Sequence, residues 1–496
     1  MHTESGSFNM KEEYREYLRD ESRLSGRADS IAFPRSEDEL RARLAGAHHD
    51  GERVTVQGAR TGITGGAVPR GGRVLNLSRM KNIAVPPREQ NQEAFLKVQP
   101  GALLEEVRAA TEFFFPPDPT ETTASLGGMT ACDASGARSL FYGSTRAYIQ
   151  RLRLVLADGS VLDLKRGEQK AKGRAFSLAT EDGRTVSGSL PRYSMPAVKN
   201  AAGYFVKDDM DMLDLFCGSE GTLGVISEIE LRLIPPPRAV WGVMVFLPTE
   251  SQAVEFVNLC RGLNTRQSAL EFFDSHSLEL LRRQKKENPA FSDLQEPPDD
   301  AGTAVYAEYH GPDDEAVEES VMEMSGVIDR CGGNEDATWL ASGPADMEKM
   351  KYFRHAVPEA VNLTIDRLKQ KNPDLTKLGT DFAVPDDSLD EALNMYLEDL
   401  KNARLDYVIF GHIGDNHVHV NIIPDSMEKY SLGKELYLQW AQKIAALGGT
   451  VSGEHGIGKL KTDLLEIMYG KDAVQEMKQL KNIFDPENML NVGNLF

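Results

Sequence analysis

Three loops rich in glycine and other small residues constrain this chain more than any other feature of its sequence. Residues 57–66 (QGARTGITGG) follow a strand-like segment at 54–56, and two similar stretches cover 126–136 (LGGMTACDASG) and 217–226 (CGSEGTLGVI). Glycine allows positive φ and lets backbone N–H groups approach a phosphate closely. Taken alone, the first loop also fits a structural turn, because it is neither a Walker loop nor a G-x-G-x-x-G turn. Together, the three loops on adjoining strands predict backbone that surrounds a large, flat ligand.

The order of apolar and polar segments predicts strands and helices in more than one domain. A chain of 496 residues exceeds what a single hydrophobic core usually organises. The triple proline at 235–237 marks the clearest boundary, and the polar, glycine-interrupted residues 165–191 predict an inserted loop or hairpin. We expect strands at 29–33, 54–56, 72–77, 95–98, 151–156, 240–246 and 304–309, and helices at 37–47, 252–263 and 314–331.

Charge and composition exclude several classes of protein. The net charge of −20 argues against binding to nucleic acid or to an anionic membrane surface, since both need clustered Lys and Arg. The sequence has no run of about 20 apolar residues, the length that spans a bilayer. The four cysteines lie far apart, and residues 1–20 lack the apolar core of a signal peptide. These features predict a soluble, cytoplasmic protein without a membrane span or a nucleic-acid partner.

A second constellation lies near the C-terminus, where four of the ten histidines fall in two short segments. Residues 407–422 predict two strands around a Gly-Asp-Asn turn, and strand alternation places His417, His419 and Asn421 on one face. His412 ends the incoming strand, close across the turn. Two or three imidazoles converging beside a carboxylate, such as that of Glu454, form a typical metal site. An acid–histidine pair that binds no metal is the alternative interpretation.

The loops and the histidine segments together resemble a known family. The three loop strings, in this order, and the strings GHIGDNHVHVN and SGEHGIG are similar to those of the vanillyl-alcohol oxidase/p-cresol methylhydroxylase (PCMH) superfamily. The resemblance is to its branch of D-lactate, glycolate and D-2-hydroxyglutarate dehydrogenases and covers about residues 32–496. It implies an α+β protein, with a PCMH-type FAD-binding domain of two α/β subdomains and an α+β substrate (cap) domain with an antiparallel sheet. The implied divisions are an N-terminal extension (1–24), the FAD-binding domain (25–237), the cap domain (238–455) and a C-terminal segment that returns to the FAD-binding domain (456–496).

The resemblance also implies how FAD is bound. Ala59 and Arg60 stand in the first loop where members with covalent FAD often carry His, so we expect non-covalent FAD. Asp133 and Ser135 stand where relatives often have Asn and Gly, and the 165–191 segment is longer than the usual connection. Residues implied to contact the pyrophosphate are Gly58, Arg60, Thr61, Gly62, Thr64, Gly65 and Gly66. Those implied between adenine and flavin are Pro117, Leu126, Gly127, Gly128, Gly136, Tyr142, Gly143 and Ser144. Those implied on the adenosine side are Glu220, Gly221, Gly224, Val225 and Ile226.

For the histidine segments, the resemblance implies a divalent metal, either Zn, Mn or Fe. His412, His419 and Glu454 are its implied ligands, and His455 is the implied general base. His417 stands where relatives usually have Asn. Its role is therefore open, and we treat it as a residue that supports a metal ligand.

Substrate contacts follow from the same resemblance. Arg354 matches the Arg that pairs with the substrate carboxylate, with a solvated helix Arg as the alternative, and Asn421 is implied to contact substrate. Many relatives carry Lys two residues before the aspartate that corresponds to Asp381. Gly379 stands at that position here, which leaves Lys377 as a weaker candidate for recognising a carboxylate.

The function implied by the resemblance is oxidation of a small D-2-hydroxy acid, of the D-lactate or glycolate type, to the 2-oxo acid. The chain has no iron–sulfur cysteine pattern, so electrons would leave FAD for an external acceptor: electron-transferring flavoprotein, an iron–sulfur subunit, a quinone or oxygen. Composition does not fix the oligomeric state, and a homodimer is one candidate. A redox-neutral FAD transferase of the alkyl-dihydroxyacetone-phosphate synthase type and a non-catalytic flavoprotein subunit are the alternatives.

Overall fold

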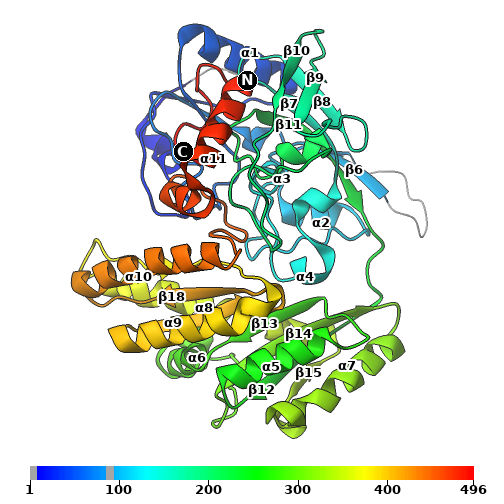
Figure 1. Ribbon diagram of the computed structural model, residues 1–496, viewed down its shortest axis with the longest axis vertical. Coiled ribbons are helices and arrows are strands. Elements are labelled where there is room, and N and C mark those ends of the chain that lie inside the picture. Colours follow the sequence, from blue (N-terminus) through cyan, green and yellow to red (C-terminus); the bar gives the residue numbers. More distant parts are fainter. Residues whose placement is uncertain (1–7, 85–93) are drawn as a thin grey trace.

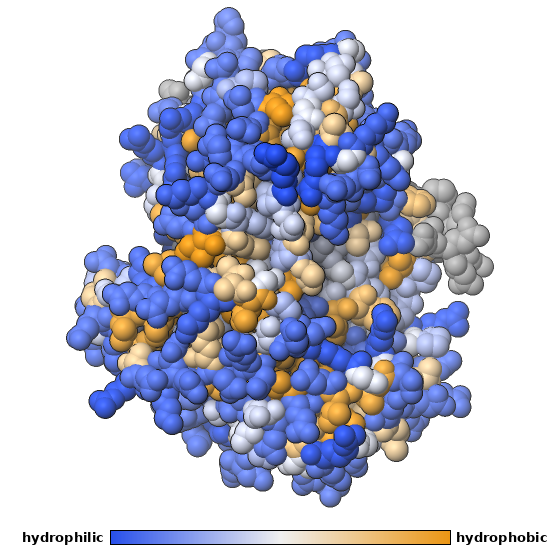
Figure 2. Space-filling view, in the orientation of Figure 1, coloured by the Kyte–Doolittle hydropathy of each residue, from blue (hydrophilic) through white to orange (hydrophobic). Residues whose placement is uncertain are grey.

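The computed structural model describes residues 8–84 and 94–496 and shows two domains, one above the other in Figure 1. The first domain contains the blue, cyan and upper green parts of the chain together with the red C-terminal helix. The second contains the lower green, yellow and orange parts. Hydrophilic side chains cover most of the face in Figure 2, and hydrophobic ones gather where the domains meet and over the second domain. Each domain combines helices with a sheet, so the predicted α+β class is confirmed.

Four short strands form the first sheet, in the order β1-β2-β4-β3, with β2, β4 and β3 parallel. The helix predicted at 37–47 is confirmed as α1 (Glu37–Asp50), which packs Leu40 and Leu44 against this sheet. Ser36 caps its first turn through a side-chain hydrogen bond, and Gly51, with φ of 67°, ends it. The strands are β1 (Phe8–Asn9), β2 (Ser30–Ala32), β3 (Val54–Gln57) and β4 (Arg73–Asn76).

Five antiparallel strands form the second sheet, in the order β5-β6-β11-β7-β8. The 165–191 segment is a hairpin of two paired strands, which confirms one of the two expectations for it. The hairpin is packed, because Phe176 stacks on Phe484 with ring centroids 5.7 Å apart. The strands are β5 (Ile83–Ala84), β6 (Ala94–Val98), β7 (Ile149–Val155), β8 (Val161–Lys165) and β11 (Val225–Leu233), with β9 (Ala175–Ala179) and β10 (Thr185–Ser189) in the hairpin. Short helices between them are α2 (Leu104–Ala110), α3 (Leu126–Cys132) and α4 (Ser139–Tyr142).

The second domain is built on one seven-stranded antiparallel sheet, in the order β15-β12-β14-β13-β17-β18-β16. Its strands are β12 (Ala239–Leu247), β13 (Ala269–Phe273), β14 (Thr303–Gly311), β15 (Trp339–Ala341), β16 (Leu378–Gly379), β17 (Tyr407–His412) and β18 (His417–Ile422). Its helices are α5 (Glu250–Arg261), α6 (Ser275–Glu287), α7 (Asp314–Ile328), α8 (Pro344–Lys369), α9 (Leu389–Ala403) and α10 (Met427–Ala446).

Helices cover both faces of this sheet. Along β12, Val243 and Val245 share a core with α5 and α7, whereas Met244 and Phe246 share a separate core with α6 and α8. A strand buried on both faces is apolar throughout rather than alternating. This explains why residues 240–246 form a continuous apolar run, and the strand predicted there is confirmed.

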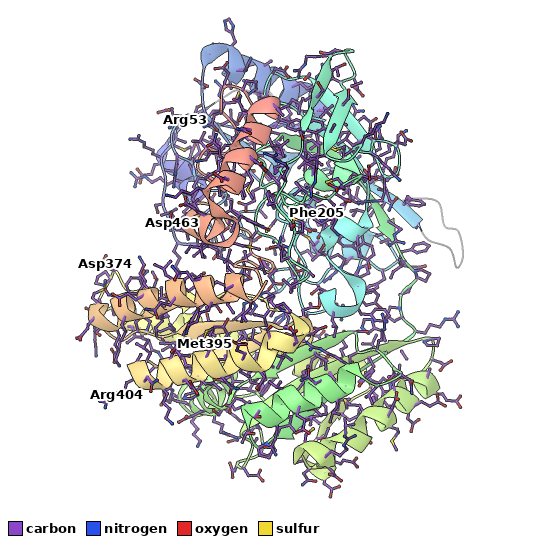
Figure 3. The ribbon with its side chains drawn as sticks, viewed as in Figure 1. Arg53, Phe205, Asp374, Met395, Arg404 and Asp463 are labelled. Carbon is purple, nitrogen blue, oxygen red and sulfur yellow. The ribbon has the colours of Figure 1, made fainter. Side chains whose placement is uncertain are left out.

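The chain end lies against the first domain. The helix α11 (Thr462–Phe484) bends at Gly470, and beyond it the N–H of Val54 in β3 donates to the Met489 carbonyl at 2.8 Å. Figure 3 places Asp463, at the start of α11, close to the junction of the domains, and Arg404, which ends α9, at the outer edge of the second domain. Within residues 8–84 and 94–496, no helix has both the length and the apolar character needed to cross a membrane.

Candidate metal and flavin site

The hairpin of β17 and β18 brings three histidines together. His412 pairs directly with His417 across the turn, and His419 follows two residues later on the same face of β18. The ring of His419 lies 4.5 Å from that of His417 and 5.5 Å from that of His412, measured between centroids. All three side chains are buried. Strand alternation predicted this shared face, and the prediction is confirmed.

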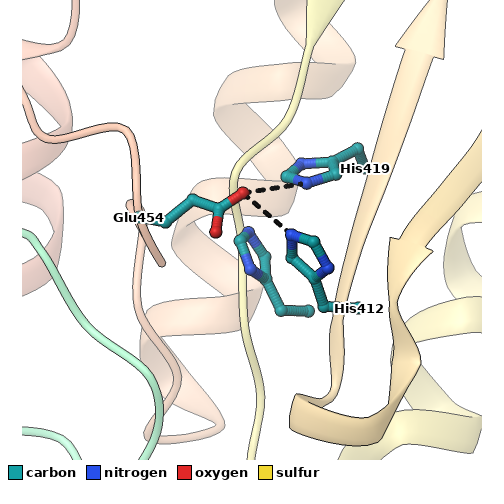
Figure 4. A group of neighbouring side chains, drawn as sticks. His412, His419 and Glu454 are labelled. Atoms are coloured by element: carbon teal, nitrogen blue, oxygen red, sulfur yellow. Dashed lines mark hydrogen bonds and ion pairs between the residues drawn. The ribbon is translucent and has the colours of Figure 1, made fainter. Parts of the chain in front are cut away.

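The predicted metal ligands converge on one carboxylate oxygen. Glu454 Oε1 lies 3.0 Å from His412 Nε2 and 3.5 Å from His419 Nε2 (Figure 4). The opposite ring nitrogens are held elsewhere: His412 Nδ1 bonds Glu271 Oε1 at 2.7 Å, and His419 Nδ1 bonds the Thr380 carbonyl at 3.1 Å. Such outer partners fix the ring orientation of histidine ligands in metal sites. Both Nε2 atoms therefore point at the position where a cation could be held.

An ammonium group and a hydroxyl group of the first domain contact the other carboxylate oxygen of Glu454. Lys199 Nζ lies 2.7 Å and Ser135 Oγ 3.2 Å from Glu454 Oε2. Burial opposes ionisation of Glu454, but His412 and Lys199 outweigh it and hold the pKa of this carboxyl well below its usual value. Burial likewise opposes protonation of His412, yet the carboxylates of Glu271 and Glu454 raise its pKa to about 9. The cluster is therefore built to bind positive charge.

Asp381 contacts the ring of His455, the predicted general base. Its buried carboxylate lies 3.2 Å from His455 Nδ1 and accepts hydrogen bonds from His417 Nε2 at 2.9 Å and from Lys461 Nζ at 2.8 Å. Despite burial, His455 and Lys461 keep the pKa of Asp381 well below its usual value. With Nδ1 directed at Asp381, His455 presents Nε2 toward the cluster, 3.7 Å from Glu454 Oε1.

The predicted substrate residues have different surroundings. Arg354 Nη2 is 3.8 Å from Glu271 Oε2, so its guanidinium lies beside the carboxylate that orients His412. Asn421 is buried on the same face of β18 as His419 and pairs with Gly379 across the sheet edge. Burial and the nearby charge of Arg23 lower the pKa of Lys377.

Hydrogen bonds connect the three glycine-rich loops to one another. Ser125 Oγ accepts the N–H of Ala59 at 3.2 Å and that of Gly128 at 3.3 Å, which joins the first loop to the second. A Cβ on Gly58 would lie 2.0 Å from this oxygen, so only glycine allows the approach. The second loop meets the third where the N–H of Glu220 donates to the Ala131 carbonyl at 2.8 Å.

The first loop has the features that an anionic ligand requires. Arg60 and Gly65 have positive φ, at 66° and 76°, and the space where a Cβ of Gly62 would stand is open. Among the described residues, Nη1 of Arg60 is buried without a hydrogen-bond partner. These observations fit the predicted pyrophosphate. The other residues predicted to contact FAD lie on or beside the same three loops: Thr61, Thr64, Gly66, Pro117, Leu126, Gly127, Gly136, Gly143, Ser144, Gly221, Gly224, Val225 and Ile226.

The segment from Glu454 to Leu460 connects the histidine–carboxylate cluster to these loops. The N–H groups of Lys459 and Leu460 donate to the carbonyl of Thr64 in the first loop, at 2.9 and 3.2 Å. In the third loop, the carboxylate of Glu220 accepts the N–H groups of Ile457 at 2.7 Å and of residue 458 at 2.8 Å. A predicted metal ligand, Glu454, thus lies on a stretch of backbone that contacts the first and third glycine-rich loops.

Buried charges also join the two domains. Arg138, just before α4, donates from Nε to Glu308 Oε1 on β14 at 2.7 Å. Glu308 also accepts from Tyr306 Oη at 2.8 Å and lies 2.9 Å from His310 Nε2. Tyr142, predicted on the flavin path, places its hydroxyl 2.7 Å from His310 Nδ1. The segment that directly follows the second loop is therefore fixed against the sheet of the second domain.

Comparison with known sequence families gives the site its context. Residues 28–165 match the FAD binding domain family, and residues 236–495 match the C-terminal domain of FAD linked oxidases. The chain belongs to the FAD-linked oxidases. It is 28% identical to a D-lactate dehydrogenase of Anaerostipes hadrus, over 97% of this chain and 92% of that protein. The glycolate oxidase subunit GlcD of Bacillus subtilis is 28% identical over 94% of this chain and 89% of its own.

Other similarities support the same family. A D-2-hydroxyglutarate dehydrogenase of Xanthomonas citri is 27% identical over 94% of this oxidase and 89% of its own length. A solved structure of alkyldihydroxyacetonephosphate synthase shares the fold, with a TM-score of 0.59 over 94% of this chain and 76% of that one, at 16% identity. The family resemblance predicted from the loop strings is confirmed.

Several residues of the site were not found from the sequence. Glu271 has a local signal, since it is a charge inside the apolar strand β13 (ALEFF) and is 6% exposed. A carboxylate in such a buried strand indicates that another polar or charged group pairs with it. Lys199 and Thr380 have no such signal, because Lys199 is 255 positions from Glu454 and Thr380 contributes only its carbonyl to His419.

Proposed function

We propose that this FAD-linked oxidase is a metal-assisted dehydrogenase of a small D-2-hydroxy acid, of the D-lactate or glycolate type. The relatives named for D-lactate and glycolate support the substrate class. The observation that carries the proposal is the convergence of the Nε2 atoms of His412 and His419 on one oxygen of Glu454. A hydroxy acid offers a hydroxyl and a carboxylate on adjacent carbons, which suits chelation of a cation at that point.

Two groups would supply chemistry that the side chains lack. Bound non-covalently by the three glycine-rich loops, FAD would take the hydride from the substrate carbon. A divalent cation held by His412, His419 and Glu454 would lower the pKa of the substrate hydroxyl. The remaining tasks are to remove a proton and to orient the substrate, and both belong to side chains of this chain.

His455 is the proposed general base. Asp381 lies 3.2 Å from its Nδ1, which favours the tautomer with the proton on Nδ1 and a lone pair on Nε2. Nε2 lies on the cluster side, near Glu454. A base at this position would take the hydroxyl proton as the hydride leaves. Asp381 acts through His455 and is a positioning residue.

Arg354 and Asn421 are the proposed substrate contacts. The side chain of Arg354 is 12% exposed, and its buried Nε has no hydrogen-bond partner among the described residues. Such a group suits a planar carboxylate, which can accept two parallel hydrogen bonds. Its neighbour Glu271 faces it at 3.8 Å, so substrate would complete the neutralisation of Arg354 rather than replace that contact.

Anaerobic stopped-flow spectroscopy tests the proposal. The FAD-loaded, metal-loaded protein is mixed with D-lactate, glycolate or D-2-hydroxyglutarate, with L-lactate as the control, and bleaching of the flavin is followed. We expect at least one of the D-acids or glycolate to bleach the flavin. His455→Ala should keep its FAD and metal but slow bleaching by about 10²–10⁴-fold, the usual contribution of a general base. His49→Ala, which removes an exposed histidine of α1, is the matched control.

Two results would contradict the proposal. Unchanged bleaching in His455→Ala removes that residue from the role of base. No bleaching with any of the hydroxy acids favours the redox-neutral transferase or the non-catalytic subunit instead.

The proposal includes the wider setting of the reaction. Electrons would pass to an external acceptor, namely electron-transferring flavoprotein, an iron–sulfur subunit or a quinone. We propose the cytoplasm as the compartment and a homodimer as the assembly. We also propose domain boundaries at 24/25, 237/238 and 455/456, so that the last segment completes the FAD-binding domain.

A further inference from the structure

His417 differs from the other histidines of the cluster in how its ring is held. It is completely buried, and its Nε2 lies 2.9 Å from Asp381 Oδ1. Asp381 Oδ1 also accepts the backbone N–H of Glu454 at 3.3 Å, and Oδ2 accepts from Lys461 Nζ at 2.8 Å, so the carboxylate acts as the acceptor in its hydrogen bond with His417. The proton of the neutral ring therefore lies on Nε2, and Nδ1 carries a lone pair.

That lone pair has no hydrogen-bond partner within the part of the chain that the structure describes. Burying a polar atom without a partner is unfavourable, and buried polar atoms in proteins are almost always satisfied. Packing explains why the ring is buried, since a Cβ on Gly453 would lie only 2.8 Å from it. Packing does not explain why one nitrogen is left free.

The surroundings of His417 indicate what satisfies this nitrogen. One ring nitrogen from each of His412, His417 and His419 and one oxygen of Glu454 all lie within 4.8 Å of one another. A histidine beside such a cluster that donates one N–H to a carboxylate and leaves its other nitrogen unpaired resembles a metal-bound imidazole with its supporting carboxylate. The same carboxylate, Asp381, also orients the proposed base His455.

We propose that His417 is a further ligand of the metal, through Nδ1, so that the protein offers three imidazoles and one carboxylate. The inference rests on the proposed metal site and adds a donor that the resemblance does not assign, since relatives usually have Asn at this position. Imidazole donors favour zinc or ferrous iron, whereas manganese and magnesium prefer oxygen donors. The third imidazole therefore shifts the preference of this site away from manganese.

X-ray absorption spectroscopy of the zinc-loaded, FAD-loaded protein tests this proposal by counting imidazole ligands. We expect three in the wild type and two in His417→Asn. Asparagine removes the imidazole, and its shorter side chain also gives up the hydrogen bond from Nε2 to Asp381, so the imidazole count is the readout that identifies a ligand. His49→Asn, at an exposed position on α1, is the control for loss of one histidine.

Metal affinity, measured by competition with a chelator, gives a second readout. Loss of a residue that only supports a ligand weakens binding about 10–100-fold. Loss of a ligand should exceed this for zinc and should change manganese binding less. Two imidazoles in the wild type, an unchanged zinc-to-manganese preference in His417→Asn, or no metal binding at all would each overturn the proposal. The count is independent of turnover, so three imidazoles in a protein that fails to oxidise hydroxy acids would contradict only the proposed function.

Discussion

The buried ion cluster between the domains makes a quantitative prediction for Glu308→Ala. Glu308 is 2% exposed and accepts hydrogen bonds from Arg138 at 2.7 Å and Tyr306 at 2.8 Å. Removing one partner of a buried ion pair costs about 3–5 kcal/mol, because the remaining charge stays buried and unpaired. Asp118 Oδ2 lies 3.7 Å from Arg138 Nη1 and partly compensates. We therefore expect a loss at the lower end, about 3 kcal/mol.

Urea unfolding at pH 7, followed by circular dichroism, measures this loss as a change in the free energy of unfolding. Asp346→Ala is the matched control, because it removes a pair with Lys349 of similar length, 2.8 Å, in which both side chains are more than half exposed. Exposed pairs contribute about 0–1 kcal/mol. A loss below about 1 kcal/mol for Glu308→Ala would refute the claim that burial sets the strength of the cluster.

The same cluster predicts a pH dependence. Burial opposes ionisation of Glu308, but Arg138 and His310 outweigh it and lower its pKa. A lowered pKa contributes stability that is complete above the pKa of the unfolded chain, about 4.3, and is lost as the pH falls toward the folded value. Glu308→Gln removes this titration, so its free energy of unfolding should fall less steeply than that of the wild type below about pH 4.5. If the free energy of unfolding falls equally steeply with decreasing pH in both proteins, this assignment to Glu308 is wrong.

Two further variants test the site. Glu271→Gln weakens the hydrogen bond that orients His412, so metal affinity measured by chelator competition should drop about 10–100-fold with FAD content unchanged; an equal loss of FAD would indicate general misfolding instead. Gly458→Ala would place a Cβ 2.2 Å from the Thr64 carbonyl at a φ of 53°, so the purified protein should lose FAD absorbance, whereas Gly46→Ala, with open space around it, should retain it. Full FAD occupancy in Gly458→Ala would show that the first loop tolerates displacement.

The sequence predicted those parts of the fold whose signal is local. The strand pattern of 407–422 placed three histidines correctly because alternation depends only on neighbouring residues. The apolar run of β12 identified a strand, but did not reveal that different helices cover its two faces. The helix predicted at 314–331 ends at Ile328 and continues as a 3₁₀ turn to Cys331, since helix ends depend on tertiary contacts.

The sequence predicted those residues of the candidate site that lie inside the family's sequence motifs, but not the residues outside these motifs. His412, His419 and Glu454 meet as expected, although 35 or more residues separate Glu454 from either histidine. The groups that hold them in place are scattered: Glu271 is on a neighbouring strand, and Lys199 comes from the other domain. Nothing in one sequence shows that a lysine and a carboxylate so far apart will meet, because that contact depends on how the two domains pack.

The backbone from Glu454 to Leu460 has a consequence for assembly of the holoprotein. It carries the proposed metal ligand Glu454 and the proposed base at one end, and at the other it is hydrogen-bonded to Thr64 of the first glycine-rich loop. Anything that orders one end therefore lowers the entropy cost of ordering the other. Thermodynamic linkage then requires reciprocity: if bound FAD raises the affinity for the cation, the bound cation raises the affinity for FAD by the same factor. Removal of either FAD or the cation would therefore lower the affinity of the protein for the other.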